Sequence, residues 1–463
     1  MKKVMVIGLD CAAPQLVFDA WRDDLPNISS LMEHGVWGKL RSTDPPITVP
    51  AWMSMLTSKS PGRLGFYGLR NRADYSYAKM SIPNSAQVKE PTVWEILSKE
   101  DRKCIVIGVP QTYPPKPLNG YLVSCFLTPS TKNDFTYPKE FKAEVEEVTG
   151  GYILDCDNFR TDEKDRILDQ IFEMTDKRCR LAQHCLKTKE WDFFMMVEMG
   201  TDRIHHGFWK YMDKTHLKYE PGNPYEDAIK RYYKFCDEKI GELLSLIDDE
   251  TTVLIVSDHG ARKMDGGICI NEWLIREGYL TLKEQPATAA PIEKCNVDWE
   301  KTRAWGSGGY YARLMINVQG REPQGTVAPG DEYEALRSEL ISKLEALGDH
   351  EGKPMKTKVV RPEDVYPECR NIPPDLFVYF DDLNWRSVGS IGLNEIYTFE
   401  NDTGPDDANH DWHGIFVMSP AGSRNGQKTG KERTDLDIKD VAPTILSYIG
   451  SQVPEDMEGK VVD

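Results

Sequence analysis

Short apolar runs recur along the chain, and longer segments with helical periodicity separate them. Each run is nearly continuous in apolar residues, as is typical of parallel strands that are covered on both faces. The runs are VMVIG (4–8), CIVIGV (104–109), FFMMVE (193–198), TVLIVS (252–257) and GIFVMS (414–419). The helical patterns lie at Thr92–Lys99, Glu163–Leu186, Tyr225–Ile247 and Tyr333–Leu347. Strands that alternate with helices predict an α/β fold with a doubly wound, mostly parallel sheet flanked by helices.

Two regions fit this alternation poorly. Residues 110–162 are rich in Pro, Tyr and Asn, and residues 280–400 hold YYARLMINV and DLFVYF among Pro-rich connections. We predict a cap insertion at 110–162 and a cap or lid insertion at 280–400. The length allows either one large α/β domain with insertions or two to three domains, and we interpret both regions as insertions in one domain over 1–463.

The overall charge limits the classes of partner. The 57 basic and 74 acidic side chains give a net charge of −17, which argues against a large nucleic acid or an anionic membrane surface. A small phosphoester substrate is compatible with this charge, because a local metal site can override the overall field. Every apolar run is shorter than the roughly 18 residues of a membrane-spanning helix. The ten cysteines contain no CxxC pair, which favours free thiols in a reducing, cytoplasmic location.

Aspartates follow three of the apolar runs. VMVIGL ends in Asp10, FFMMVEMGT is followed by Asp202, and TVLIVS is followed by Asp258. Sites in open α/β sheets form at the carboxyl ends of the strands, so these carboxylates are expected at one edge. A single aspartate at such a place is usually a helix cap or a turn former. Three together repel one another unless cations lie between them, which points to a metal site.

Histidines accompany two of these aspartates. His259 directly follows Asp258, and His206 lies four residues after Asp202, so that the latter two share one face of a helix. Neutral imidazole with carboxylate is a ligand set for zinc, manganese or iron. One further histidine would complete the set. The segment ANHDWHGIF offers two candidates, His410 and His413.

A threonine stands where a loop meets a helical segment in ITVPAWMSMLTSKSPG (47–62). Thr48 lies two residues before Pro50, and proline is favoured in the first turn of a helix. The hydroxyl is either an N-cap or a nucleophile. In the second case the free N–H groups of the first turn would point toward an incoming phosphoryl group.

These motifs, taken in chain order, resemble those of the alkaline phosphatase superfamily, and within it the type I phosphodiesterase/nucleotide pyrophosphatase branch. The resemblance spans nearly the whole length. The similar segments are VIGLD, PPITVPAWMSMLTSKSPGRLGFYG, TDRIHH, VSDHG, HDWHGIF and IKDVAPTILSYIGSQVPEDMEGK. The resemblance implies a two-metal phosphoester hydrolase, either a phosphodiesterase or a nucleotide pyrophosphatase, that acts through a phosphothreonine intermediate.

The resemblance also implies the ligands of two divalent metal ions. One site is implied at Asp202, His206 and His410. The other is implied at Asp10, Asp258, His259 and the oxygen of Thr48, which is also the implied nucleophile. His410 is preferred to His413 because it lies four residues before Gly414, as in the family pattern. The mixture of histidine and aspartate favours zinc and is compatible with manganese or iron.

The sequence departs from its relatives near the implied nucleophile. Ala51 stands where nucleotide pyrophosphatases have an Asn that helps to hold a phosphoryl oxygen, and Leu64 stands where a His often precedes the glycine. Trp52 occupies the position of the sulfatase arginine, which argues against sulfatase chemistry. The neighbouring aromatic residues are expected either to hold the second substituent of a diester or to pack in the core. They are Trp52, Phe66 and Tyr67, with Arg63 and Arg70 close by in sequence.

Two other classes of function stay open at this point. A phosphomonoesterase or a metal-dependent phosphomutase would use the same metal ligands and nucleophile. A non-catalytic, metal-stabilised binding protein could share the fold, because fold alone does not determine function.

Overall fold

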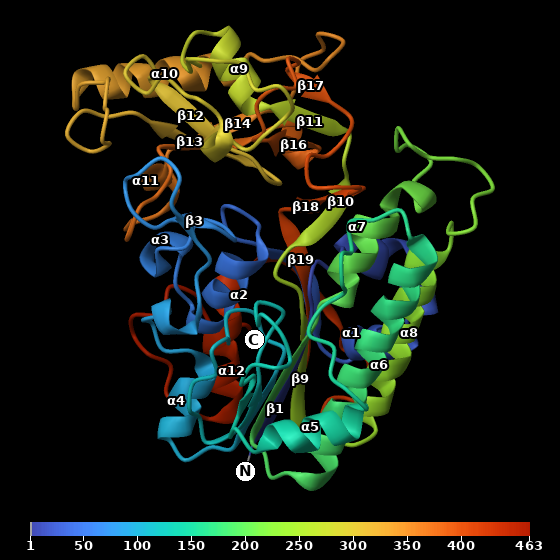
Figure 1. The fold of residues 1–463 in the computed structure, drawn as a ribbon. Coiled ribbons are helices and arrows are strands. Elements are labelled where there is room, and N and C mark those ends of the chain that lie inside the picture. The colour runs from blue at the N-terminus through green and yellow to red at the C-terminus, as the bar shows by residue number, and fades with distance from the viewer. Residues whose placement is uncertain (1) are drawn as a thin grey trace.

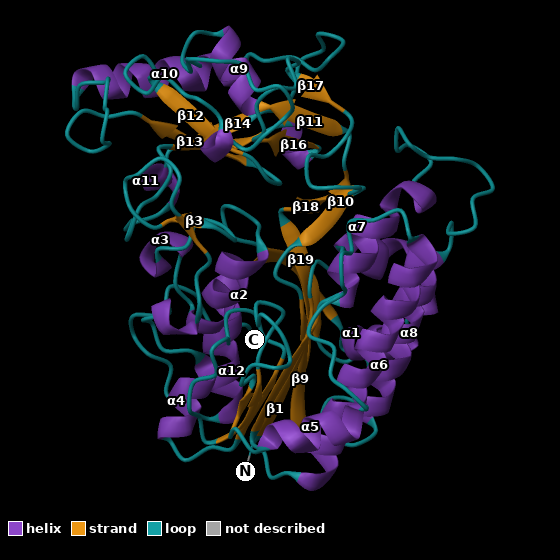
Figure 2. Cartoon of the chain, in the orientation of Figure 1, coloured by secondary structure: helices purple, strands orange, loops and turns teal. Residues whose placement is uncertain are grey.

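A nine-stranded sheet forms the centre of the larger lobe of the molecule (Figures 1 and 2). The computed structural model describes residues 2–463. The strand order is β20-β2-β19-β9-β1-β8-β5-β6-β7. The bounds of these strands are β1 Lys3–Leu9, β2 Val36–Arg41, β5 Cys104–Ile107, β6 Gly120–Val123, β7 Thr136–Tyr137, β8 Phe193–Glu198, β9 Thr251–Val256, β19 His413–Ser419 and β20 Lys431–Asp437. The five consecutive strands from β9 to β6 are all parallel.

The predicted α/β fold with a mostly parallel sheet is confirmed, with one difference in strand direction. The run GIFVMS forms most of β19, which pairs antiparallel with both β9 and β2. Helices cover both faces at this point, so an antiparallel strand here is as continuously apolar as its parallel neighbours. The apolar pattern therefore predicted the strand but carried no information about its direction.

Helices cover both faces of the sheet (Figure 2). One face carries α2 (Thr48–Thr57), α4 (Val93–Lys99) and α12 (Val441–Ile449). The other carries α1 (Pro26–Glu33), α6 (Lys164–Thr188), α7 (Gly200–Met212) and α8 (Ala228–Leu244). In α6 the buried positions Ile167, Ile171 and Met174 recur every three or four residues. This spacing gives the helix one apolar stripe, which packs onto the sheet and the neighbouring helices.

Residues 110–162 join the main lobe rather than forming a cap. They supply β6 and β7 at one edge of the central sheet, and α5 (Phe141–Thr149) beside α6. The two strands are only four and two residues long. Strands this short lie below the length at which an apolar pattern can be recognised, so the Pro- and Tyr-rich connections dominated the sequence signal.

A smaller lobe lies beyond the carboxyl edge of the central sheet (Figure 1). It holds an antiparallel sheet in the order β12-β13-β15-β14 and a small sheet in the order β16-β11-β17. Their bounds are β11 Gly266–Cys269, β12 Ala304–Ser307, β13 Ala312–Ile316, β14 Lys358–Val360, β15 Leu376–Tyr379, β16 Trp385–Val388 and β17 Tyr397–Thr398. The helices α9 (Ile270–Arg276) and α10 (Asp331–Glu345) complete a separate hydrophobic core. The lobe contains the predicted insertion at 280–400 and begins before it.

Two antiparallel strands join the lobes. They are β10 (Gly260–Lys263) and β18 (Ala408–Asp411), which pair with each other. The remaining short elements on the side of α2 are α3 (Pro61–Leu64), α11 (Pro362–Val365), β3 (Asn71–Arg72) and β4 (Met80–Ser81). None of the helices in residues 2–463 has the length and apolar character needed to cross a bilayer.

Candidate active site

The candidate site lies at the carboxyl ends of three adjacent strands. Asp10 follows β1, Asp258 and His259 follow β9, and Asp202 lies in the first turn of α7, just after β8. Because β1 pairs with both β8 and β9, the turns that leave these strands converge. The aspartates expected at one edge of the sheet are therefore brought together, and all of them are buried.

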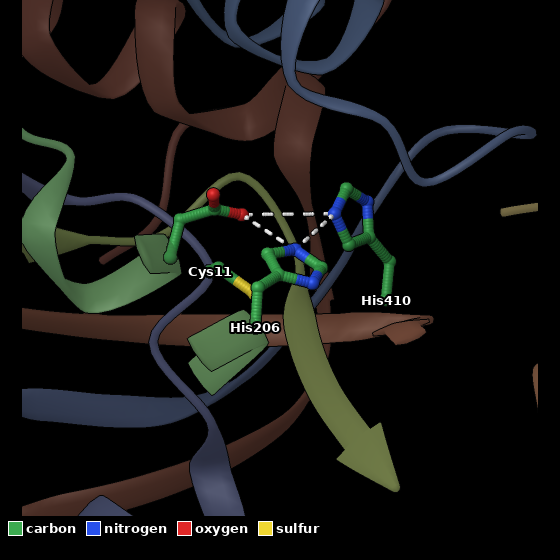
Figure 3. Close-up of side chains that lie close together, drawn as sticks. Cys11, His206 and His410 are labelled. Atoms are coloured by element: carbon green, nitrogen blue, oxygen red, sulfur yellow. Dashed lines mark hydrogen bonds and ion pairs between the residues drawn. The ribbon is translucent and has the colours of Figure 1, made fainter. Parts of the chain in front are cut away.

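One group of candidate metal ligands comes from α7 and β18. His206 Nε2 lies 3.2 Å from Asp202 Oδ1 and 3.3 Å from His410 Nε2, and His410 Nε2 lies 3.6 Å from Asp202 Oδ1. Figure 3 shows His206 and His410 turned toward each other, with the sulfur of Cys11 close by. Ligand atoms about 2.05 Å from a tetrahedral metal lie about 3.3 Å apart, so these three atoms fit around one ion.

A second group surrounds His259. Its Nε2 lies 3.0 Å from Asp258 Oδ2, 3.9 Å from Asp10 Oδ1 and 3.3 Å from Thr48 Oγ1. Ligand atoms of Asp10, Asp202 and His259 also lie within 4.8 Å of one another. Asp202 thus borders both groups, and two cations could occupy neighbouring positions.

The charges at the second group call for a cation. Asp10 Oδ1 is fully buried and has no hydrogen-bond partner among the described residues. Burial, together with the nearby carboxylates of Asp258 and Asp202, raises the pKa of Asp10 well above its usual value. A divalent metal would neutralise this repulsion and satisfy the orphaned oxygen, so the residues fit the metal that the sequence implies.

The three histidines differ in protonation when no metal is bound. Burial opposes the charged form of each ring, but the Asp406 and Asp202 carboxylates raise the pKa of His206 to about 9. In His259 the effect of burial is outweighed by Asp258, and its pKa is also about 9. Burial and the neighbouring His259 lower the pKa of His410 to about 3, so its ring is neutral.

Thr48 does not cap the helix that it begins. The N-cap of α2 is Ile47, and no side chain bonds to the first-turn N–H groups. The Thr48 hydroxyl faces His259 instead, at the edge of the second group. The N-cap interpretation of Thr48 is therefore excluded, and the hydroxyl is free for another role.

Comparison with known proteins places the chain in a family. The family model for type I phosphodiesterase/nucleotide pyrophosphatase matches residues 4–406. The chain belongs to the type I phosphodiesterase/nucleotide pyrophosphatase family. As a member of this family within the alkaline phosphatase superfamily, it is a metal-dependent phosphoester hydrolase. No curated protein matches the sequence.

Solved structures of this superfamily share the fold. Human ectonucleotide pyrophosphatase/phosphodiesterase 5 superposes with a TM-score of 0.56 at 12% identity, covering 98% of this chain and 97% of that chain. Phosphonoacetate hydrolase from Sinorhizobium meliloti 1021, in complex with phosphonoformate, has a TM-score of 0.61 at 14% identity and covers 97% and 96% of the two chains. At these identities the likeness establishes the fold alone.

The hydrolase has supporting contacts that the sequence did not indicate. Asp406 Oδ1 lies 2.8 Å from His206 Nδ1, and the ring of Tyr310 stacks on His206 with 4.9 Å between centroids. Trp52 Nε1 donates to Asp10 Oδ2 at 2.6 Å. These partners are distant in sequence from the residues that they hold. For Asp406 the sequence offers one local signal, the acidic pair Asp406–Asp407 shortly before His410.

Asp406→Asn is expected to weaken metal binding at the first group by about 10- to 100-fold, because the carboxylate orients His206 and raises its basicity. The affinity is measured by competition with a chromophoric chelator. Asp407→Asn is the matched control, since Asp407 is also buried and adjacent, but its carboxylate faces Lys210 and not the imidazole of His206. Equal affinities in the two variants would contradict the role given to Asp406.

The aromatic residues near Thr48 in sequence belong to the core. Trp52, Phe66 and Tyr67 are buried, and Arg63 forms ion pairs with Glu90 and Asp456 outside the site. Of these aromatic and arginine residues, Arg70 alone lines the cavity that Ile47 borders. His413 lies on β19, half-buried, and belongs to neither ligand group.

A cavity of about 330 Å³ opens between the two lobes and is bordered by Ile47, the residue before Thr48 in the chain. Its wall includes Ile47, Tyr310 and Tyr311, so it reaches the residues beside both ligand groups. Four arginines also line it: Arg70, Arg160, Arg313 and Arg386. Arg160 and Arg386 are paired with Asp406 and Asp402, whereas Arg70 and Arg313 form no ion pair with any described residue. The cavity therefore has positive charge available for an anionic ligand.

Proposed function

We propose that this hydrolase is a two-metal phosphodiesterase with Thr48 as its nucleophile. The observation that carries the proposal is the position of Thr48 Oγ1, which caps no helix and lies 3.3 Å from His259 Nε2 at the edge of the acidic cluster. Murine ectonucleotide pyrophosphatase/phosphodiesterase 5 has a solved structure of an inactive threonine-to-alanine variant in complex with AMP, which supports a catalytic threonine in this fold.

The residues that would hold the metals form the two groups described above. One is Asp202, His206 and His410, and the other is Asp10, Asp258, His259 and Thr48 Oγ1. Bound divalent metals would lower the pKa of the threonine hydroxyl and stabilise negative charge on the leaving oxygen. The imidazole and carboxylate donors support zinc as the resident metal.

The chemistry at Thr48 is an in-line displacement followed by hydrolysis. Thr48 Oγ1 loses its proton to solvent and forms a bond to phosphorus, and the leaving group departs with the electron pair of the broken P–O bond. Water then attacks the phosphothreonine and restores the hydroxyl. The Ala51 N–H donates to Ile47 O at 3.0 Å and Pro50 has no N–H, so the free first-turn donors belong to Thr48 and Val49. These two N–H groups would hold a phosphoryl oxygen during both steps.

The cavity that Ile47 borders supports a diester rather than a monoester. A diester carries a second organic group that needs room, and a cavity of about 330 Å³ is available beside Ile47, the chain neighbour of Thr48. Hydrolysis of bis-p-nitrophenyl phosphate should exceed that of p-nitrophenyl phosphate in the metal-loaded protein. Preference for the monoester would be compatible with the proposed metal site but would indicate a phosphomonoesterase or a phosphomutase instead of a phosphodiesterase. Turnover of neither compound would contradict the proposal.

Metal affinity is expected to rise with pH. A metal must displace the proton from His206 and from His259, whose pKa values are about 9 without metal. Below that pH the affinity of each site should rise at least tenfold per pH unit, because each histidine gives up one proton and any further protonated ligand adds to the slope. Competition titrations at several pH values between about 6.5 and 8.5 measure this slope. A pH-independent affinity over this range would contradict the assigned ligands.

We also propose a reducing, cytoplasmic location. All ten cysteines are free thiols, and eight of them are buried. Unpaired buried thiols are the common state of cysteine in reducing compartments, which supports this location.

A further inference from the structure

Cys11 lies between the two ligand groups and has no part in the mechanism described above. It follows Asp10 at the end of β1, and its side chain is fully buried. Its Sγ lies within 4.8 Å of the ligand atoms of Asp202, His206 and His410. Figure 3 shows the sulfur close beside the His206 side chain. We propose that Cys11 Sγ is the fourth protein ligand of the metal held by these three residues.

The geometry supports a four-ligand shell. The three nitrogen and oxygen atoms are separated by 3.2, 3.3 and 3.6 Å, close to the spacing of about 3.3 Å expected around a tetrahedral ion. A sulfur at about 2.3 Å from the same ion would lie about 3.6 Å from each of them. The Cys11 sulfur is near enough to all three atoms to take this corner after a small adjustment of its side chain.

The surroundings of the thiol favour a ligand over a packing residue. The neighbouring Asp10 Oδ1 is fully buried without a hydrogen-bond partner and marks the region as one built for cations. The Cys11 Sγ donates a hydrogen bond to the Gly260 carbonyl at 3.3 Å. The backbone N–H of Cys11 donates to Asp258 Oδ1 at 3.1 Å, which fixes the residue between the groups. The thiol is therefore held beside one carboxylate and two imidazoles.

Ligation by Cys11 would determine which metal is bound. On binding, the S–H bond breaks, the proton leaves to solvent, and a metal–sulfur bond forms. Together with Asp202, the thiolate would balance the two charges of a divalent ion. Thiolate is a soft donor that selects zinc over manganese and magnesium, whereas the second group offers only oxygen and nitrogen. The two positions would then differ in metal preference.

X-ray absorption of the resting protein loaded with two zinc ions tests this proposal. We expect a sulfur contribution at about 2.3 Å, averaging half a sulfur per zinc because only one site contains cysteine. Cys11→Ser should remove this contribution. Cys104→Ser is the matched control and should keep it, because Cys104 is also buried but lies at the opposite end of β5 from the site.

A second readout uses cobalt. The Co²⁺-loaded protein should show a thiolate-to-cobalt charge-transfer band that Cys11→Ser lacks and Cys104→Ser keeps. The selectivity for zinc over manganese at this position should fall at least tenfold in Cys11→Ser.

The proposal for Cys11 rests on the proposed two-metal site but not on its activity. The experiment can therefore distinguish failure of the Cys11 proposal from failure of the proposed function. A sulfur-free shell in the wild-type protein with two zinc ions bound would overturn the role of Cys11 alone, even if diesters are hydrolysed. Failure of the wild-type protein to bind zinc would overturn both the cysteine ligand and the proposed function. The wild-type spectrum decides the question even if Cys11→Ser does not fold.

Discussion

Thr48→Ala is expected to lower kcat/KM for bis-p-nitrophenyl phosphate by about 10⁴-fold or more, the scale of losing a covalent nucleophile. The variant keeps Asp10, Asp258 and His259 as ligands at the second group, so its metal content should stay close to two ions per chain. The loss should appear in kcat, because the cavity that binds the second substituent of the diester is untouched. Steady-state kinetics with metal analysis of the same sample measure both quantities.

Thr57→Ala provides the matched control on the same helix. Thr57 is also buried, and its hydroxyl donates to Met53 O at 2.6 Å at the far end of α2. Its loss should change stability modestly and activity little. Retained turnover in Thr48→Ala, at more than a tenth of the wild-type rate, would place the nucleophile elsewhere.

His410→Ala is expected to remove one metal ion and to lower activity by more than about 10²-fold. Loss of a residue that only supports a metal ligand costs up to about 10²-fold, so loss of a ligand itself should cost more. His410 Nε2 faces both His206 and Asp202, and its pKa of about 3 keeps it neutral and ready to bind. Its Nδ1 lies 2.9 Å from the Pro46 carbonyl, which fixes the ring orientation. Metal content by atomic emission and diester hydrolysis measure the two losses.

His413→Ala separates the two histidines of ANHDWHGIF. His413 is three residues along the chain, half-buried on β19, and contributes to neither ligand group. Its replacement should leave two metals bound and activity within about threefold of wild type, as for surface changes away from a site. The reverse result, with metal lost from His413→Ala and kept in His410→Ala, would show that the wrong histidine has been assigned.

The carboxylates of the site could be predicted because they depend on local pattern and strand topology. Asp10, Asp202 and Asp258 each follow an apolar run, and the carboxyl ends of adjacent parallel strands must meet at one edge. His206 and His259 followed from their spacing to these aspartates. The choice of His410 and the role of Thr48 came from resemblance to a family, since neither is fixed by local spacing.

The contacts that hold these ligands could not be predicted. Trp52 reaches Asp10 across 42 positions, and Asp406 reaches His206 across 200. Such pairs depend on how α2 and the β10–β18 connection pack, which no periodicity encodes. The antiparallel direction of β19 and the presence of the edge strands β6 and β7 could not be predicted for a related reason. Burial and short length remove the alternation that distinguishes one kind of strand from another.

The stereochemical course at phosphorus tests the central claim most directly. Each in-line displacement inverts the configuration, so attack by Thr48 followed by attack of water gives two inversions. Hydrolysis of a chiral phosphorothioate diester in isotopically labelled water is therefore predicted to proceed with net retention. This result does not require the phosphothreonine to accumulate. Net inversion would mean that water attacks the substrate directly, and it would contradict Thr48 as the nucleophile.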